Sequence, residues 1–162
     1  MAEKEKMTIA VLSGDLERAL AAFMLAVTGA AMGMEVKMFF TFWGLNIIKK
    51  NESNVKSKGL MLKMMNMINR GGSKRLKFSK FNMLGLGTPM MKGLMKKANI
   101  PSLEEYIIMA KDLGVQMIAC TTTCGMMGII PEKDSFRGEV DMLAGAALFL
   151  GEARESKVTL FI

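Results

Sequence analysis

Two short strand-like segments separated by one helix-length segment constrain the fold of this chain most strongly. Met7–Leu12 and Glu35–Phe40 have the length and apolar content of buried strands, and residues 16–32 between them have the composition of a helix. Ser13-Gly14-Asp15 supplies a turn and a capping side chain, Ser13 or Asp15, before that helix, and Gly33 closes it. Strands joined by a single helical crossover run parallel. The chain therefore begins with a βαβ unit.

The C-terminal part repeats the alternation of helix and strand. Ser102, with Glu105 three residues later, forms a capping box that predicts a helix reaching about Leu113. A strand is predicted over Val115–Ala119, an Ala-rich helix over Met142–Glu155, and a last strand over Lys157–Ile162. This order predicts an α/β fold, a three-layer sandwich with a mostly parallel, doubly wound sheet.

Residues 51–100 differ in character from the rest and are interpreted as an insertion or cover on a single domain, residues 1–162. The segment is rich in Met, Lys, Asn and Gly, and it is too broken to hold a core of its own. Within it, helices are predicted over Leu60–Asn69 and Pro89–Ala98, and a short strand or loop over Phe78–Leu86.

Two residue types limit the chemistry open to this chain. Histidine is absent, which excludes Cys-His and Ser-His-Asp nucleophilic pairs and His-ligated zinc sites. Only two cysteines are present, so a disulfide scaffold is not expected and neither is a metal site. We therefore expect no cofactor. The charged start MAEKEK runs directly into a strand rather than a leader, and no apolar run is long enough to span a bilayer, so a cytoplasmic protein is expected.

Candidate site residues follow from the rule that ligands bind at the carboxyl ends of parallel strands. Cys120 stands where a buried strand ends, and Thr121, Thr122, Thr123, Cys124 and Gly125 follow it. Hydroxyl groups and free backbone N–H groups there would lower the thiol pKa, and the thiolate is the reactive form. The competing interpretation is an inert core cysteine. Ser13, Asp15 and Trp43 follow the two other strands and are candidates for ligand binding, although Asp15 also suits a helix cap and Trp43 a core position.

Three stretches of this chain resemble DsrE-like proteins. ACTTTCGMMGI, residues 119–129, is similar to the family's strand ending in Ala-Cys with a polar loop and a Met-Gly-Ile turn. Residues 7–44 resemble the family's first βαβ unit, and residues 140–162 resemble its C-terminal part. The resemblance therefore spans most of the chain apart from the basic insertion.

The resemblance implies a DsrEFH or flavodoxin-like fold, homo-oligomers and a persulfide-carrying or sulfurtransferase role. The cysteine position of the family corresponds to Cys120, which would form the persulfide. Cys124 stands where related sequences commonly have Met, and is either a secondary, resolving thiol or without a role. TusA-like or rhodanese-like sulfur-transfer proteins are the expected partners.

The middle of the chain carries a strong positive charge that the resemblance does not explain. Residues 41–100 hold 13 Lys or Arg and one acid, Glu52, which gives +12. Four interpretations stay open: a solvated cover, a docking surface for an acidic protein, self-association, and peripheral contact with an anionic membrane. Nucleic acid is not expected, because only Phe78 and Phe81 supply aromatic rings among these charges. The alternative to sulfur transfer is a non-catalytic module that docks a protein or membrane through this segment.

Overall fold

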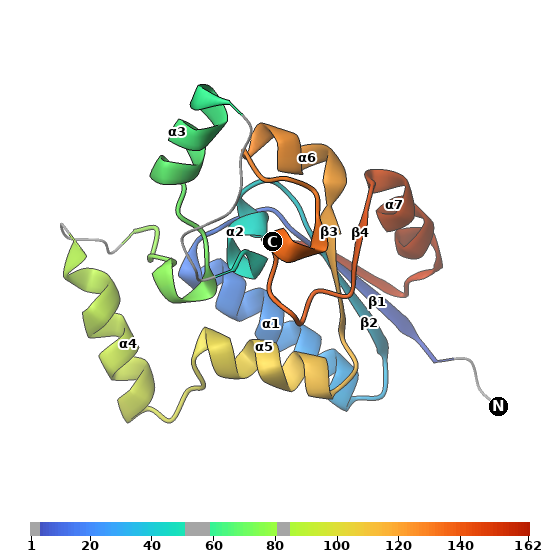
Figure 1. Ribbon diagram of the computed structural model, residues 1–162. Coiled ribbons are helices and arrows are strands. Elements are labelled where there is room, and N and C mark those ends of the chain that lie inside the picture. The colour runs from blue at the N-terminus through green and yellow to red at the C-terminus, as the bar shows by residue number, and fades with distance from the viewer. Residues whose placement is uncertain (1–3, 51–58, 81–84) are drawn as a thin grey trace.

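The computed structural model describes residues 4–50, 59–80 and 85–162 as one sheet covered by helices (Figure 1). The sheet has five strands, all of them parallel, in the order β4-β3-β2-β1-β5. Their bounds are β1 Lys6–Val11, β2 Glu35–Phe40, β3 Gln116–Cys120, β4 Met142–Ala144 and β5 Val158–Phe161. The α/β sandwich expected from the sequence is confirmed, and every strand pairing is parallel rather than most of them.

Helices lie on both faces of this sheet, as a parallel sheet requires. Helices α1 (Leu16–Ala31) and α5 (Leu103–Asp112) pack against each other on one face, and α7 (Ala146–Glu155) covers the opposite face (Figure 1). The capping box predicted for α5 is present, with Ser102 and Glu105 bonded to each other's backbone N–H groups. Because β4 and β5 are the two edge strands, the connection between them, which contains α7, passes across the whole sheet.

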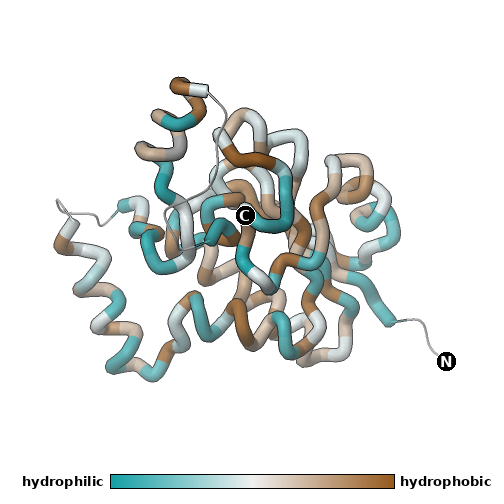
Figure 2. The backbone as a smooth tube through the Cα atoms, in the orientation of Figure 1, coloured by the Kyte–Doolittle hydropathy of each residue, from teal (hydrophilic) through white to brown (hydrophobic). Residues whose placement is uncertain are grey.

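Side chains that alternate along the strands form two cores. Ile9, Met38 and Met117 belong to the larger cluster under α1 and α5. Ala10, Phe39, Ile118 and Cys120 point to the other face and form a smaller cluster with Phe149 of α7. The hydrophobic tube segments accordingly gather in the centre of the molecule (Figure 2). Cys120 therefore faces the thinner of the two cores.

The helix predicted from the sequence over residues 142–155 was wrong in its first residues. Met142–Ala144 is the edge strand β4 rather than the first turn of a helix, and α7 begins only after Gly145. Tertiary pairing explains the difference, because Asp141 exchanges bonds with Met117: its N–H donates to the Met117 carbonyl and its carboxylate accepts the Met117 N–H, both at 2.9 Å. These bonds start a ladder on β3 that overrides the helical preference of Met and Leu.

The middle segment contains the helices predicted for it. The 3-10 turn η1 (Phe42–Gly44) and α2 (Leu45–Ile48) follow β2, and α3 (Leu60–Ile68), the 3-10 turn η2 (Ser73–Arg75) and α4 (Gly87–Lys97) come next. Residues 78–80 form no regular strand, and part of the strand or loop predicted over 78–86 lies outside the described residues.

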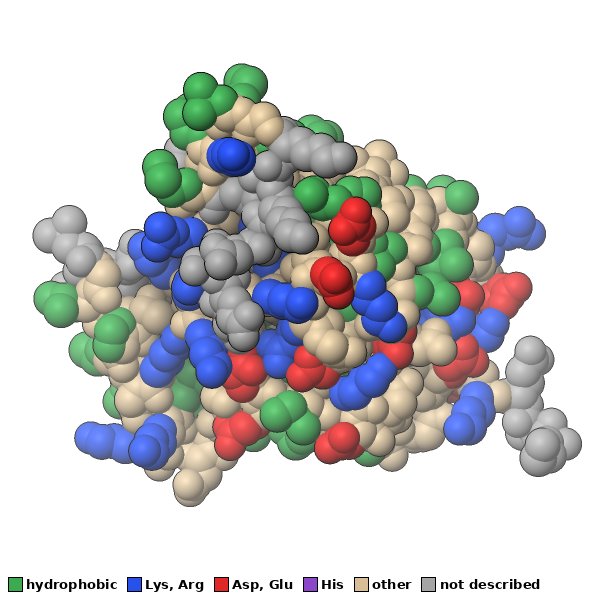
Figure 3. Space-filling view, viewed as in Figure 1, with side chains coloured by type: hydrophobic (Ala, Val, Ile, Leu, Met, Phe, Trp, Pro, Cys, Tyr) green, Lys and Arg blue, Asp and Glu red, His purple; other side chains and the backbone are tan. Residues whose placement is uncertain are grey.

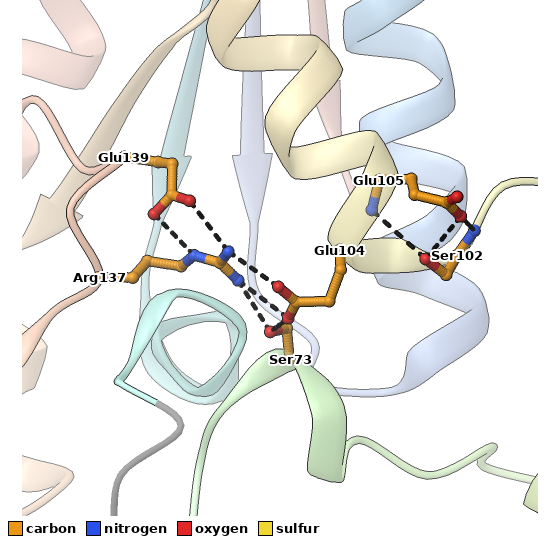
Figure 4. A network of polar contacts seen from close by, with 6 residues as sticks. All are labelled: Ser73, Ser102, Glu104, Glu105, Arg137 and Glu139. Atoms are coloured by element: carbon orange, nitrogen blue, oxygen red, sulfur yellow. Dashed lines mark hydrogen bonds and ion pairs between the residues drawn. The ribbon is translucent and has the colours of Figure 1, made fainter.

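A polar network is one of the contacts that join this segment to the body of the molecule. Leu76 lies in the larger core, and buried Ser73 donates to Glu104 of α5. Arg137 bonds Ser73, and it forms ion pairs with Glu104 and Glu139, each at 3.0 Å (Figure 4). The network ties η2 to α5 and to the segment before β4. Within the described ranges, no helix combines the length and the apolar character needed to cross a bilayer.

Candidate functional site: the end of strand β3

Cys120 is the last residue of β3, and the helix α6 (Thr121–Met126) starts directly after it. The neighbouring strand β4 pairs Ala144 with Cys120. Only 3% of the Cys120 surface is exposed. The thiol therefore sits at the carboxyl edge of the sheet, almost fully buried in the smaller core.

Hydroxyl groups from two different elements surround this thiol. Thr123 of α6 and Thr41, which follows β2, both hydrogen-bond with Cys120 through their side chains. The two hydroxyl oxygens lie 3.2 Å apart, and the Phe42 N–H donates to Thr123 Oγ1 at 3.3 Å. Strand ends that are distant in sequence thus meet at one sulfur atom.

These bonds decide the acidity of the thiol. Burial raises the pKa of Cys120, but hydrogen bonds from the Thr123 side chain and backbone, from the Thr41 hydroxyl and from the Thr122 backbone N–H lower it. The donors prevail, and the pKa of Cys120 lies below that of an ordinary cysteine. A thiol with this environment has more thiolate at neutral pH, which is the nucleophilic form.

Cys124 has the opposite environment, although it lies one helical turn away. Its side chain is fully buried, and its Sγ donates to the Cys120 carbonyl oxygen at 3.1 Å. Burial, together with the nearby Cys120, raises the pKa of Cys124 to about 11, and the positive charge of Lys49 only partly opposes this. Both cysteines are free thiols. The two thiols, one at the N-cap of α6 and one within α6, therefore differ in acidity, and Cys120 is the more acidic.

Lys49 is a buried, charged residue near Cys124 of α6, and nothing in the sequence indicated its burial. It is 2% exposed, and its ammonium donates to the Asn69 carbonyl oxygen at 3.1 Å. Burial lowers the pKa of Lys49 to about 8, against a smaller opposing effect of Cys124. It could not have been recognised from local sequence, because Lys49 and Lys50 read alike and only the first is buried.

The remaining sequence-based candidates fall into two groups. Thr121 and exposed Thr122 and Gly125 lie on α6 beside Cys120, whereas Ser13, Asp15 and Trp43 line a separate hollow of about 310 Å³ with Gly14 and Asn46. No residue of 120–125 is among the described residues lining that hollow. Ser13 and Asp15 mainly bond each other, through the Ser13 hydroxyl at 2.9 Å and the Asp15 N–H at 3.1 Å, and the Asp15 carboxylate makes no capping bond to α1. Trp43 is 53% exposed, so the core position considered for it is wrong.

Thr41 is the residue at this site that the sequence-based prediction missed. Thr41 lies two residues before the candidate Trp43, at the same end of β2. Its hydroxyl, not the Trp43 ring, is directed to Cys120. The expectation that no metal binds here stays a prediction; among the described residues, no group of three or more His, Cys, Asp or Glu side chains is placed to hold an ion.

Comparison with known proteins shows which family and which relatives the chain resembles. The family described as DsrE/DsrF/DrsH-like matches residues 3–161. The uncharacterised protein YrkE of Bacillus subtilis (strain 168) is 39% identical over 160 residues, covering 99% of this chain and 98% of its own. The sulfur carrier protein DsrE2 of Allochromatium vinosum is 34% identical over 169 residues, covering 99% of each chain.

Proposed function

The chain belongs to the DsrE/DsrF/DrsH-like family, and from this premise we propose that it is a sulfur carrier or sulfurtransferase that forms a persulfide on Cys120. The observation that carries the proposal is the position of the Cys120 thiol at the carboxyl edge of the sheet, where Thr41, Thr122 and Thr123 lower its pKa against the effect of burial. The named function of the DsrE2 relative supports the same class of chemistry.

The proposed reaction has two balanced steps. The Cys120 thiolate attacks the outer sulfur of a donor persulfide, the donor S–S bond breaks, and the donor leaves as a thiolate. An acceptor thiolate then attacks the outer sulfur on Cys120, and the Cys120 thiolate leaves. No oxidant or reductant is consumed, because the sulfur atom passes from one thiol to another.

The hydrogen bonds around Cys120 assist both steps. They raise the fraction of nucleophilic thiolate before the first step, and they stabilise the same thiolate as the leaving group in the second. The Thr41 and Thr123 hydroxyls are positioning groups in this scheme.

Cys124 is a secondary thiol in this proposal and not the carrier. With its pKa at about 11 and no exposed surface, it stays protonated at neutral pH and is a weak nucleophile toward a persulfide on Cys120. A persulfide on Cys120 would then persist until a partner thiol arrives. Such partners, of the TusA-like or rhodanese-like kind, and assembly into homo-oligomers in a cytoplasmic setting remain part of the proposal.

Intact-protein mass spectrometry after incubation with glutathione persulfide tests this function. We expect a gain of about 32 Da, one sulfur atom, on the wild-type chain and on Cys124→Ser, and none on Cys120→Ser. Full loading of Cys120→Ser would refute the assignment to Cys120. Loading of no variant would instead favour the non-catalytic docking module.

A further inference from the structure

Helix α3 is apolar on two sides, but only one of them is covered. On the inner side, the Leu62 carbonyl oxygen and the Met65 Cβ approach Gly128, the turn after α6, so closely that a Cβ on Gly128 would lie 3.1 and 3.6 Å from them. On the outer side, Leu60, Met61, Met64 and Met67 are exposed by 86%, 78%, 54% and 62%. Large apolar side chains repeated at helical spacing and left in solvent mark a surface that something else covers.

Helix α4 repeats this arrangement. Leu86, at its N-cap, and Met90 and Leu94 follow one another at intervals of four residues, and all three are at least half exposed. Figure 3 shows hydrophobic side chains over the outer ends of α3 and α4, along the same side of the molecule, with Lys and Arg side chains between them. We call these seven side chains and the basic residues among them the α3–α4 face.

The two segments that carry this face contribute charge of a single sign. Residues 59–80 and 85–100 contain nine Lys or Arg and no acidic residue, and all nine basic side chains are exposed. Seven of the nine are Lys, including Lys63 of α3 and Lys96 and Lys97 of α4. The cover must therefore be anionic and must also accept apolar side chains.

The kind of basic residue distinguishes lipid from protein as that cover. Protein interfaces are enriched in aromatic residues, Met and Arg and depleted in Lys. Here Lys predominates over Arg, and none of the large apolar side chains exposed in residues 59–80 and 85–100 is aromatic. Lysine has a long apolar stem that lets its ammonium reach phosphate groups while neighbouring side chains enter the acyl boundary.

We propose that the α3–α4 face binds anionic lipid, so that the protein attaches peripherally to a membrane surface. The two helices lie flat on the headgroups, Leu and Met side chains insert between them, and Lys side chains pair with phosphates. This inference does not depend on the proposed chemistry of Cys120.

The test is co-sedimentation of the full chain with vesicles of pure phosphatidylcholine, and with vesicles of phosphatidylcholine and phosphatidylglycerol in equal parts. We expect binding to the mixed vesicles only, weakening as salt rises. Met64→Gln with Met67→Gln leaves the charge unchanged and should reduce the bound fraction at least severalfold. Met32→Gln, at an exposed methionine at the end of α1, should bind as the wild type does.

Three results would overturn the proposal. The first is no binding to mixed vesicles at low salt. The second is unchanged binding by the double Gln variant when Lys96→Glu with Lys97→Glu abolishes it, which would mean adsorption by charge alone. The third is self-association in sedimentation velocity that the double Gln variant removes while the wild type ignores vesicles, which would make the face a contact between two copies of this chain.

Discussion

The hydroxyl groups of Thr41 and Thr123 are hydrogen-bonded to each other at 3.2 Å, and both also bond the thiol of Cys120. Thr41 follows β2, whereas Thr123 lies in the helix after β3. Next to Thr41, Phe42 adopts a positive φ of 48°, a conformation that costs energy for a residue other than glycine, and from there its N–H donates to Thr123. The acidity of Cys120 therefore depends on how the end of β2 is held against α6.

The first prediction is that Thr41→Val slows the reaction of Cys120 at neutral pH. The variant keeps the shape of the side chain but removes a hydroxyl that stabilises the thiolate, so the pKa of Cys120 should rise. The rate of alkylation by iodoacetamide, followed against pH, should fall several-fold near pH 7 and recover in alkali. Thr28→Val is the matched control, because that hydroxyl bonds only the Met24 carbonyl on the exposed side of α1. An unchanged pH profile in Thr41→Val would contradict this account.

The second prediction concerns Lys49 and the pH dependence of stability. Burial lowers the pKa of Lys49 from 10.5 to about 8 in the folded state, so the unfolded chain binds more protons between these two values. The contribution of Lys49 to the free energy of unfolding should therefore rise with pH across that window, and its full destabilising effect is present below about pH 8. The raised pKa of Cys124 acts in the opposite direction above pH 9, so the effect of Lys49 is measured as the difference from a variant that lacks it. The size of the gain is about 3 kcal/mol between pH 8 and 10.5, from the size of the pKa difference.

Lys49→Met isolates this effect, because it keeps the volume and removes the titrating group. Urea unfolding of both proteins is measured between pH 7 and 10.5 with a reductant present. The free energy of unfolding of the wild type should increase relative to that of the variant as pH rises. Parallel pH curves for the two proteins would mean that Lys49 is not desolvated as described. Lys50→Met, at the half-buried neighbour, should leave the shape of the curve unchanged.

The third prediction is that Arg137→Ala destabilises the fold by about 2 to 3 kcal/mol. Arg137 holds Glu104, Glu139 and Ser73 together, and its loss leaves two carboxylates close to each other without their cation (Figure 4). This expected loss of stability is smaller than the roughly 3 to 5 kcal/mol lost when a fully buried ion pair is broken, because both carboxylates keep some contact with solvent. Urea unfolding measures the loss of stability, and Arg154→Ala, at an exposed position of α7, is the control. Equal midpoints for the two variants would show that the network adds nothing to stability.

The sequence predicted the sheet and its covering helices well because each of these elements carries its own signal. The strand Glu35–Phe40 is found with the bounds predicted for it, and the capping box of Ser102 and Glu105 forms as read. The edge strand β4 was missed, because three residues have no measurable period and are held by the bonds of Asp141 to Met117. Pairing of this kind is visible only in three dimensions.

The site was predicted in outline for a similar reason. Cys120 and the Thr residues after it are contiguous, so their position at a strand end could be inferred from sequence. The contribution of Thr41, and the separation of Ser13, Asp15 and Trp43 into another hollow, depend on how the segments after β1 and β2 are arranged in three dimensions. Nor does the sequence distinguish buried Lys49 from half-buried Lys50.

The fourth prediction is that Gly44→Ala damages both the stability and the thiol. Gly44 ends η1, and a Cβ there would lie 2.1 Å from the Val11 carbonyl oxygen, a backbone atom that cannot simply rotate away. Either η1 or the end of β1 must shift, and overpacking of this kind costs about 1 to 3 kcal/mol. Because η1 begins directly after Thr41, the shift should also move Thr41 and Phe42 away from Thr123, and Cys120 should react more slowly at neutral pH.

Gly151→Ala is the matched control for this prediction. Gly151 lies inside α7 with no atom within 4 Å of an added Cβ, so alanine should stabilise that helix by about 0.5 to 1 kcal/mol. Urea unfolding and the rate of Cys120 alkylation at pH 7 should be measured on both variants. If Gly44→Ala loses stability but keeps the wild-type alkylation rate, then η1 is packed as described, but it does not set the acidity of Cys120 through Thr41.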